Sequence, residues 1–115
     1  QLDRPLVEAL QAKGFTVAVE TNGTIDLPDD RHGLDWVCCS PKDPDHLQLR
    51  AADELKVVVP AKVVPDDYAK RVKAKALYVQ PMDGADNGIE YAVAWVKTHP
   101  RWKISTQCHK VWGIE

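Results

Sequence analysis

Five short apolar runs, each bordered by a compact polar cluster, recur along this chain of 115 residues. They are Val17–Val19, Trp36–Cys39, Leu55–Val59, Leu77–Val79 and Trp102–Ser105. Short runs that are rich in Val and bounded by Gly, Pro or charged residues are typical of buried strands. Parallel α/β sheets gather their functional side chains at the carboxyl ends of the strands. We therefore expect the polar clusters to meet at one shared site.

Helical patterns lie between several of these runs. Apolar spacing over Leu2–Lys13 predicts a first helix, which Gly14 ends. A short helix is expected from Pro65 to about Lys73, and a longer one over Gly88–Thr98. Strands that alternate with helices and short turns imply an α/β fold with a parallel sheet and right-handed crossovers.

The predicted strands cover Thr16–Val19, Asp35–Cys39, Glu54–Val59, Ala76–Val79 and Trp102–Ser105. The Val-Val-Val run at 57–59 suits a sheet that is covered on both faces. Some connections between the strands are too short for a full helix. We therefore expect an open, partial parallel (β/α) barrel rather than a complete eight-fold one.

Composition excludes several classes of protein. Apolar residues make up 44% and charged residues 28%, as in a globular domain. The net charge of −2 gives no electrostatic footprint for nucleic acid, and no apolar stretch approaches the roughly 18–20 residues of a membrane span. The densest basic group, residues 70–75, is interpreted as a solvated helix face. Three cysteines, two of them adjacent, make a poor disulfide framework and favour the cytoplasm.

The first two polar clusters each allow two interpretations. In Glu20-Thr21-Asn22-Gly23-Thr24, the carboxylate could accept hydrogen bonds from an amine or from ribose hydroxyls, yet Asn-Gly is also a common turn. Ser40-Pro41-Lys42 places a hydroxyl and an ammonium after a strand, where Lys42 could pair with a carboxylate or phosphate. Taken alone, that segment is more simply a surface lysine after a proline.

The third cluster is a charged pair within a strand. Glu54 and Lys56 are two residues apart and so share one face. Charges inside a parallel sheet must be satisfied. The pair therefore either rings a polar cavity or lies on a solvated edge strand.

The last two clusters carry a carboxamide and an imidazole. In Gln80-Pro81-Met82-Asp83-Gly84, Gln80 can read the donor and acceptor edge of a heterocycle; a plain turn is the alternative. In Gln107-Cys108-His109-Lys110, His109 could hold a substrate or shuttle a proton. A zinc site formed by Cys108 and His109 with Cys38, Cys39 and His46 is rejected, because adjacent cysteines and an adjacent Cys-His pair do not match the usual spacing of zinc ligands.

The order of these motifs is more specific than any one of them. It runs Val-Glu-Thr-Asn-Gly-Thr, Asp-Trp-Val then Ser-Pro-Lys, Asp-Glu-Leu-Lys-Val-Val, Gln-Pro-Met-Asp-Gly, and Trp-Lys-Ile-Ser-Thr-Gln-Cys-His-Lys-Val-Trp-Gly-Ile. This series closely resembles 7-carboxy-7-deazaguanine synthases, which are radical S-adenosylmethionine (SAM) enzymes of the queuosine and deazapurine pathway. The resemblance runs from about Leu6 to Ile114 and covers about the C-terminal half of the family's length.

The resemblance implies that residues 1–115 are the C-terminal part of a radical SAM core domain. The family's Cys-x-x-x-Cys-x-x-Cys loop and its Gly-Gly-Glu-Pro stretch do not occur in the chain. In the family a Gly-Gly-Glu-Pro-Leu segment precedes the position of Gln1. We therefore expect a partial barrel of the radical SAM type, separated from its cluster-binding N-terminal half.

The chemistry implied by the resemblance is a radical ring contraction by a carbon–nitrogen lyase. The intact enzyme would convert 6-carboxy-5,6,7,8-tetrahydropterin to 7-carboxy-7-deazaguanine with loss of ammonia. A [4Fe-4S] cluster would cleave SAM to an adenosyl radical, which would abstract a substrate hydrogen. Mg²⁺ is associated with the family, and the ligands of both metals would lie in the preceding half. The chain alone is expected to be inactive.

The resemblance also implies roles for individual residues. The SAM-binding residues would be Glu20, Asn22, Ser40, Lys42 and Gln80, and the substrate-binding residues would be Gln80, Asp83 and His109. No metal ligand and no catalytic group is expected in this chain. It departs from the family's pattern at Cys108, where Thr is usual, and in ending on Glu115.

The partners implied are a small pterin substrate, a second copy in a homodimer and a flavodoxin-type electron donor, with no nucleic acid or membrane. The alternative function is a non-catalytic, truncated or split module that binds a pterin or pairs with another chain. A weaker third hypothesis is a phosphate-binding barrel fragment.

Overall fold

Five parallel strands lie side by side in the order β1-β2-β3-β4-β5, which is also their order along the chain. The computed structural model describes residues 4–82 and 87–105. The strands are β1 (Ala18–Thr21), β2 (Trp36–Cys39), β3 (Ala51–Val59), β4 (Lys73–Pro81) and β5 (Trp102–Ile104). The predicted α/β class and the parallel sheet are confirmed.

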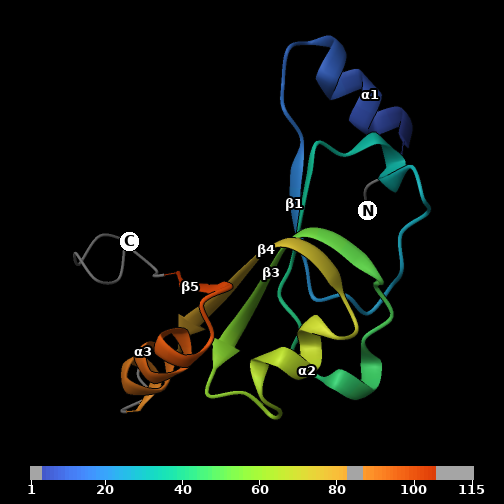
Figure 1. Cartoon of the computed structure of the whole chain (residues 1–115). Helices are drawn as coiled ribbons and strands as arrows, with labels where there is room; N and C mark the ends of the chain where they lie inside the picture. Colours follow the sequence, from blue (N-terminus) through green and yellow to red (C-terminus); the bar gives the residue numbers. More distant parts are fainter. Residues whose placement is uncertain (1–3, 83–86, 106–115) are drawn as a thin grey trace.

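Three helices accompany the sheet: α1 (Arg4–Ala12), α2 (Pro65–Ala69) and α3 (Gly88–Thr98). Figure 1 shows α1 and α3 at opposite ends of the molecule. The predicted bounds of α3 are confirmed, whereas α2 ends four residues before the predicted position because the chain enters β4 at Lys73. Short 3-10 turns cover Arg31–Gly33 and Pro44–His46. Among the described residues, no helix is long and apolar enough to cross a membrane.

Three strands differ in their bounds from the sequence prediction: β1 has the predicted length but lies two residues further along the chain, and β3 and β4 are longer. Glu20 and Thr21 belong to β1, since they pair with β2, so the predicted end of this strand at Val19 is wrong. Likewise β3 and β4 begin three residues before the predicted positions, where Ala51 already pairs with Lys73. Apolar character marks only the buried part of a strand, whereas pairing with neighbours decides its full length. Glu20 is consequently a residue of the sheet rather than of the loop after it.

One face of the sheet carries the hydrophobic core. Its buried side chains include Val37, Leu55, Val57, Val59, Leu77, Val79 and Trp102. The Trp102 ring packs edge-on against Trp95 of α3, and its Nε1–H donates to Asp66 Oδ1 of α2 at 2.8 Å. Both helices therefore pack on this face. Burial alternates along β3, with Val58 only half-buried, and so differs from the two-sided burial expected from its Val-Val-Val run.

A buried carboxylate braces the amino end of the sheet. Asp53 of β3 is 2% exposed and accepts hydrogen bonds from the Val37 backbone N–H and from Arg31 Nη1, both at 2.8 Å. Lys75 Nζ of β4 lies 3.3 Å from its other oxygen. The bond from Arg31 is the main cause that lowers the pKa of Asp53 to about 2, against the opposing effect of burial. Asp53 thus links β2, β3, β4 and the loop before β2.

Candidate functional site

The face of the sheet opposite α2 and α3 carries a row of polar side chains. In the parallel register Glu20 of β1 lies beside Cys38 of β2, which lies beside Glu54 of β3. Side chains alternate between faces along a strand, so Lys56 shares this face with Glu54. Tyr78 of β4 pairs with Lys56 in register. We call Glu20, Cys38, Glu54, Lys56 and Tyr78 the polar face.

An ion pair crosses the polar face. Lys56 Nζ lies 3.3 Å from Glu20 Oε2. The Lys56 side chain is only 18% exposed, whereas that of Glu20 is 58% exposed. Because β3 is the central strand of the five, the hypothesis that Glu54 and Lys56 lie on a solvated edge is wrong. Lys56 instead satisfies its charge with a carboxylate two strands away.

Cys38 belongs to the polar face, a role that the sequence analysis missed. Its Sγ donates to Glu54 Oε2 at 3.2 Å. Burial first, and then the bond to Glu54, raises the pKa of the Cys38 thiol to about 12. Cys39 points to the core face, where burial raises its pKa to about 11. Both thiols are therefore protonated at neutral pH. Only the pairing register reveals that Cys38 meets Glu54.

The segment after β1 forms a turn beside this face. Asn22 Oδ1 accepts from the Thr24 backbone N–H at 3.1 Å and from Thr24 Oγ1 at 2.9 Å. Gly23 has a φ of +78°, and an added Cβ would lie 2.6 Å from Leu47 Cδ1 and 3.0 Å from Cys39 Sγ, so this position favours glycine. The turn hypothesis for Asn22-Gly23 is confirmed. The role of Asn22 in ligand binding stays a prediction.

Three of the other predicted binding residues, Ser40, Lys42 and Gln80, lie at or after the carboxyl ends of β2 and β4. Ser40 follows β2, and its backbone N–H donates to Thr21 O at 2.7 Å, which joins the ends of β1 and β2. Lys42 is exposed and makes no ion pair within residues 4–82 and 87–105. Gln80 lies at the end of β4 and is 5% exposed. Asp83 and His109 lie outside the described residues, so their roles stay predictions.

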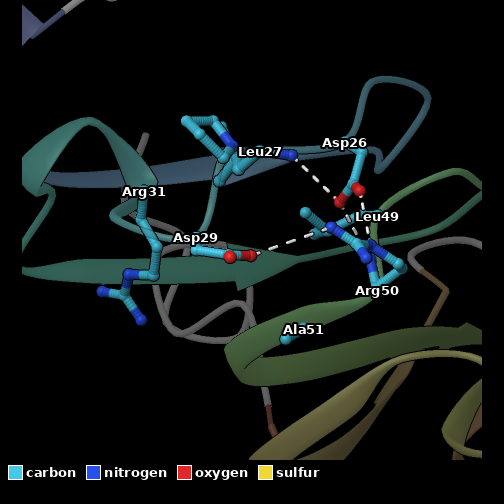
Figure 2. A pocket seen from close by; sticks show the side chains of 8 residues that line it. Asp26, Leu27, Asp29, Arg31, Leu49, Arg50 and Ala51 are labelled. Atoms are coloured by element: carbon cyan, nitrogen blue, oxygen red, sulfur yellow. Dashed lines mark hydrogen bonds and ion pairs between the residues drawn. The ribbon is translucent and has the colours of Figure 1, made fainter.

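Two other hollows lie at the amino ends of the strands. The first has a volume of about 260 Å³ and is lined by charged residues of the β1–β2 loop and by Arg50. Figure 2 shows Arg50 turned toward Asp26 and Asp29, which lie 2.6 and 4.0 Å from its guanidinium nitrogens. Because Arg50 pairs with both carboxylates, these charges stabilise the loop, and we assign this hollow no ligand.

The second hollow, of about 420 Å³, contains most of the dense basic group. Arg50, Lys70, Arg71, Lys73 and Arg101 line it. Lys73 and Lys75 lie on β4, so the interpretation of this group as a helix face is wrong, although all its members are exposed. A basic hollow at the amino ends is separate from the polar face and the carboxyl ends.

The described residues do not provide a metal site. No group of three or more His, Cys, Asp or Glu side chains that could hold a metal ion occurs in residues 4–82 and 87–105. Iron–sulfur clusters are held by cysteine thiolates, whereas Cys38 and Cys39 are protonated and point to opposite faces. These two cysteines do not fit such a cluster.

The fold and this site define an α/β protein whose parallel sheet carries a core face and an ion-paired polar face. No family model matches the chain. Curated proteins match it closely. The 7-carboxy-7-deazaguanine synthases of Burkholderia multivorans and Caulobacter vibrioides are 44% and 43% identical to it over 117 residues. The enzyme of the same name from Bacteroides thetaiotaomicron is 34% identical over 113 residues.

The first two matches cover 99% of this chain and 54% of each relative. The chain is therefore related, along nearly its whole length, to the C-terminal half of 7-carboxy-7-deazaguanine synthases. The resemblance predicted from its motifs is confirmed. The chain spans about half the length of the curated relatives it matches.

Proposed function

We propose that this chain is the SAM- and substrate-binding half of a 7-carboxy-7-deazaguanine synthase. The observation that carries the proposal is the polar face, with its ion pair between Lys56 and Glu20 beside the carboxyl ends of the strands. In parallel α/β sheets this edge is where ligands bind. The choice of SAM and a pterin as ligands is supported by the identity of 41–44% to 7-carboxy-7-deazaguanine synthases over 99% of the chain.

The side chains at this edge suit the groups that SAM presents. Its amino and ribose hydroxyl groups need acceptors, and Glu20 offers an exposed carboxylate. Its carboxylate needs a cation or donor, and Lys42 is exposed with no ion pair in the part of the chain that the structure describes. Ser40 and Gln80 add a hydroxyl and a carboxamide at the carboxyl ends of β2 and β4, on either side of β3. The donor set of the described residues therefore fits SAM.

The task of these residues is binding and orientation. When bound with its [4Fe-4S] cluster, SAM supplies the radical chemistry of this class. The chain's own groups would hold SAM and the pterin in register, and Gln80 is proposed to serve both ligands. The cluster and Mg²⁺ are assigned to residues outside this chain, in agreement with the unsuitable thiols of Cys38 and Cys39.

The finer fold assignment is also a proposal. A parallel sheet whose strands follow one another in chain order is the arrangement expected of a portion of a (β/α) barrel. We assign the five strands to a partial barrel of the radical SAM type. The homodimer, the flavodoxin-type electron donor and the cytoplasmic location stay predictions.

The proposal is tested by joining this chain to a complementary half. The chain replaces the matching segment of the Caulobacter vibrioides synthase, to which it is 43% identical. After anaerobic iron–sulfide reconstitution, the hybrid should convert 6-carboxy-5,6,7,8-tetrahydropterin to 7-carboxy-7-deazaguanine. A Lys42→Ala variant should lose product while its visible cluster spectrum is unchanged, and the unmodified Caulobacter enzyme is the positive control.

A folded hybrid that holds the cluster but forms no product would contradict the enzyme proposal. It would favour the alternative of a non-catalytic module that binds a pterin or pairs with another chain. Loss of the cluster in Lys42→Ala would show instead that Lys42 is misassigned.

A further inference from the structure

The polar face contains a lysine that the proposed function does not place among the binding residues. Lys56 lies in the middle of the central strand and is 18% exposed. A side-chain cation at such a place loses much of its hydration and needs a charged partner. Glu20 is the partner, two strands away across Cys38.

The ion pair uses one oxygen of Glu20 and leaves the other available. Lys56 contacts Oε2, and no hydrogen bond to Oε1 is formed within the described residues. The Glu20 side chain is 58% exposed, so the second oxygen can accept bonds from a ligand. An exposed glutamate without such a contact samples several rotamers, and fixing one before binding lowers the entropy cost of association.

The groups around Lys56 do not compete with Glu20 for its ammonium. Glu54 shares the face with Lys56, but its Oε2 already accepts from the Cys38 thiol at 3.2 Å. Cys38 remains neutral and therefore does not compete with Glu20 for the ammonium. Tyr78 flanks Lys56 in register on β4. The titratable groups that β1, β2, β3 and β4 place around Lys56 are thus Glu20, Cys38, Glu54 and Tyr78.

We propose that Lys56 is a positioning residue, which holds the Glu20 carboxylate in the orientation that accepts hydrogen bonds from SAM. The inference rests on the proposed function, because it takes SAM as the ligand of the polar face. It adds a residue outside the assigned binding set and states how that residue acts. Lys56 need not touch SAM itself.

The first test measures SAM binding by calorimetry. Lys56→Met keeps the length and apolar stem of the side chain but removes its charge, and should weaken SAM binding about tenfold, as expected for one weakened charged hydrogen bond. Lys56→Arg should retain affinity to within about twofold. Lys70→Met, which removes an exposed charge beyond α2, is the matched control and should bind like the unmodified chain.

A double-mutant cycle tests whether Lys56 acts through Glu20. Glu20→Gln should weaken binding, and adding Lys56→Met to it should cause no further loss. Additive losses would overturn the inference, as would unchanged binding by Lys56→Met. Far-ultraviolet circular dichroism of each variant distinguishes a binding defect from unfolding.

A measurement without ligand separates the inference from the proposed function. Methylene coupling constants of Glu20, measured by NMR, should report one dominant rotamer in the unmodified chain and averaging in Lys56→Met. A fixed Glu20 with no SAM binding would contradict the proposed function. An equally averaged Glu20 in both proteins would overturn the positioning role, whatever the affinity for SAM.

Discussion

Replacement of Asp53 by Asn tests how much the buried carboxylate at the amino end of the sheet contributes to stability. The carboxylate is 2% exposed and has three donors around it, of which Arg31 is 28% exposed and Lys75 is 77% exposed. Asn keeps an acceptor for the Val37 N–H but brings an amide N–H₂ against a cation. We expect Asp53→Asn to lower the free energy of unfolding at neutral pH by about 3 kcal/mol, since the half-buried Arg31 loses its carboxylate partner.

The pH dependence of stability gives an independent value for the free energy that the Asp53 charge contributes to folding. The pKa of Asp53 falls from its ordinary value of 3.8 to about 2 in the folded chain. Folding therefore favours the ionised form. The contribution is fully present above 3.8 and is lost as the pH falls through 2. This difference in pKa corresponds to about 2 kcal/mol.

The assay is urea unfolding followed by circular dichroism between pH 7 and pH 2. The midpoint for Asp53→Asn should lie about 2 M below that of the unmodified chain at pH 7. The difference between the two proteins should shrink to about 1 kcal/mol at pH 2, because Asp53 is then about half protonated in the folded chain and most of the contribution of its charge has been lost. Asp67→Asn, which loses an exposed pair with Lys70 at 3.8 Å, is the control and should cost no more than about 0.5 kcal/mol. A difference that did not vary with pH would refute the reasoning.

Three further predictions concern the glycine turn, the thiols and turnover. Gly23→Ala should lower the free energy of unfolding by about 2 kcal/mol, since the residue has a positive φ and its Cβ would lie 2.6 Å from Leu47 Cδ1 and 3.0 Å from Cys39 Sγ. Gly14→Ala, which also has positive φ but open space around it, should cost about 1 kcal/mol, and equal losses in urea titrations would exclude an effect of these contacts. Cys38 and Cys39 should react slowly with iodoacetamide at pH 8 in the folded chain and rapidly in urea, because burial raises their pKa values to about 12 and 11. Peptide mass spectrometry measures the modification, and rapid modification of the folded chain would contradict their burial. The chain alone should form no 5′-deoxyadenosine from SAM after iron–sulfide reconstitution, and detection of that product by chromatography would mean that it holds a cluster.

Much of the fold follows from local sequence patterns. The apolar runs locate all five strands, and the apolar spacing of Gly88–Thr98 gives α3 with its observed bounds. The ends of strands are harder to predict, because Glu20 and Lys73 join the sheet through backbone pairing with neighbours far along the chain. Composition favours a loop at such residues, whereas the parallel ladder decides their conformation.

The candidate site, like the fold, could be predicted only where local sequence patterns determine it. The clusters after the runs indicate which residues lie at the carboxyl ends, and Glu54 and Lys56 are recognisably on one face. Neither pattern gives the partner of Lys56, since Glu20 is 36 residues away and contacts it across an intervening strand. The contact of Cys38 with Glu54 could not be predicted either, because it depends on the pairing of β2 with β3. Its neutral, buried thiol looks like core packing until the register places Glu54 beside it.

The most direct test of the account is a SAM titration of the isotopically labelled chain, followed by backbone amide NMR. The account predicts that chemical shifts change at the carboxyl ends and the polar face, at Glu20, Ser40 and Lys42. It also predicts that Arg50 and Lys73, at the amino ends of β3 and β4, do not respond. Shifts confined to the amino ends, or no response at any of these residues, would contradict the claim that the polar face is the SAM site.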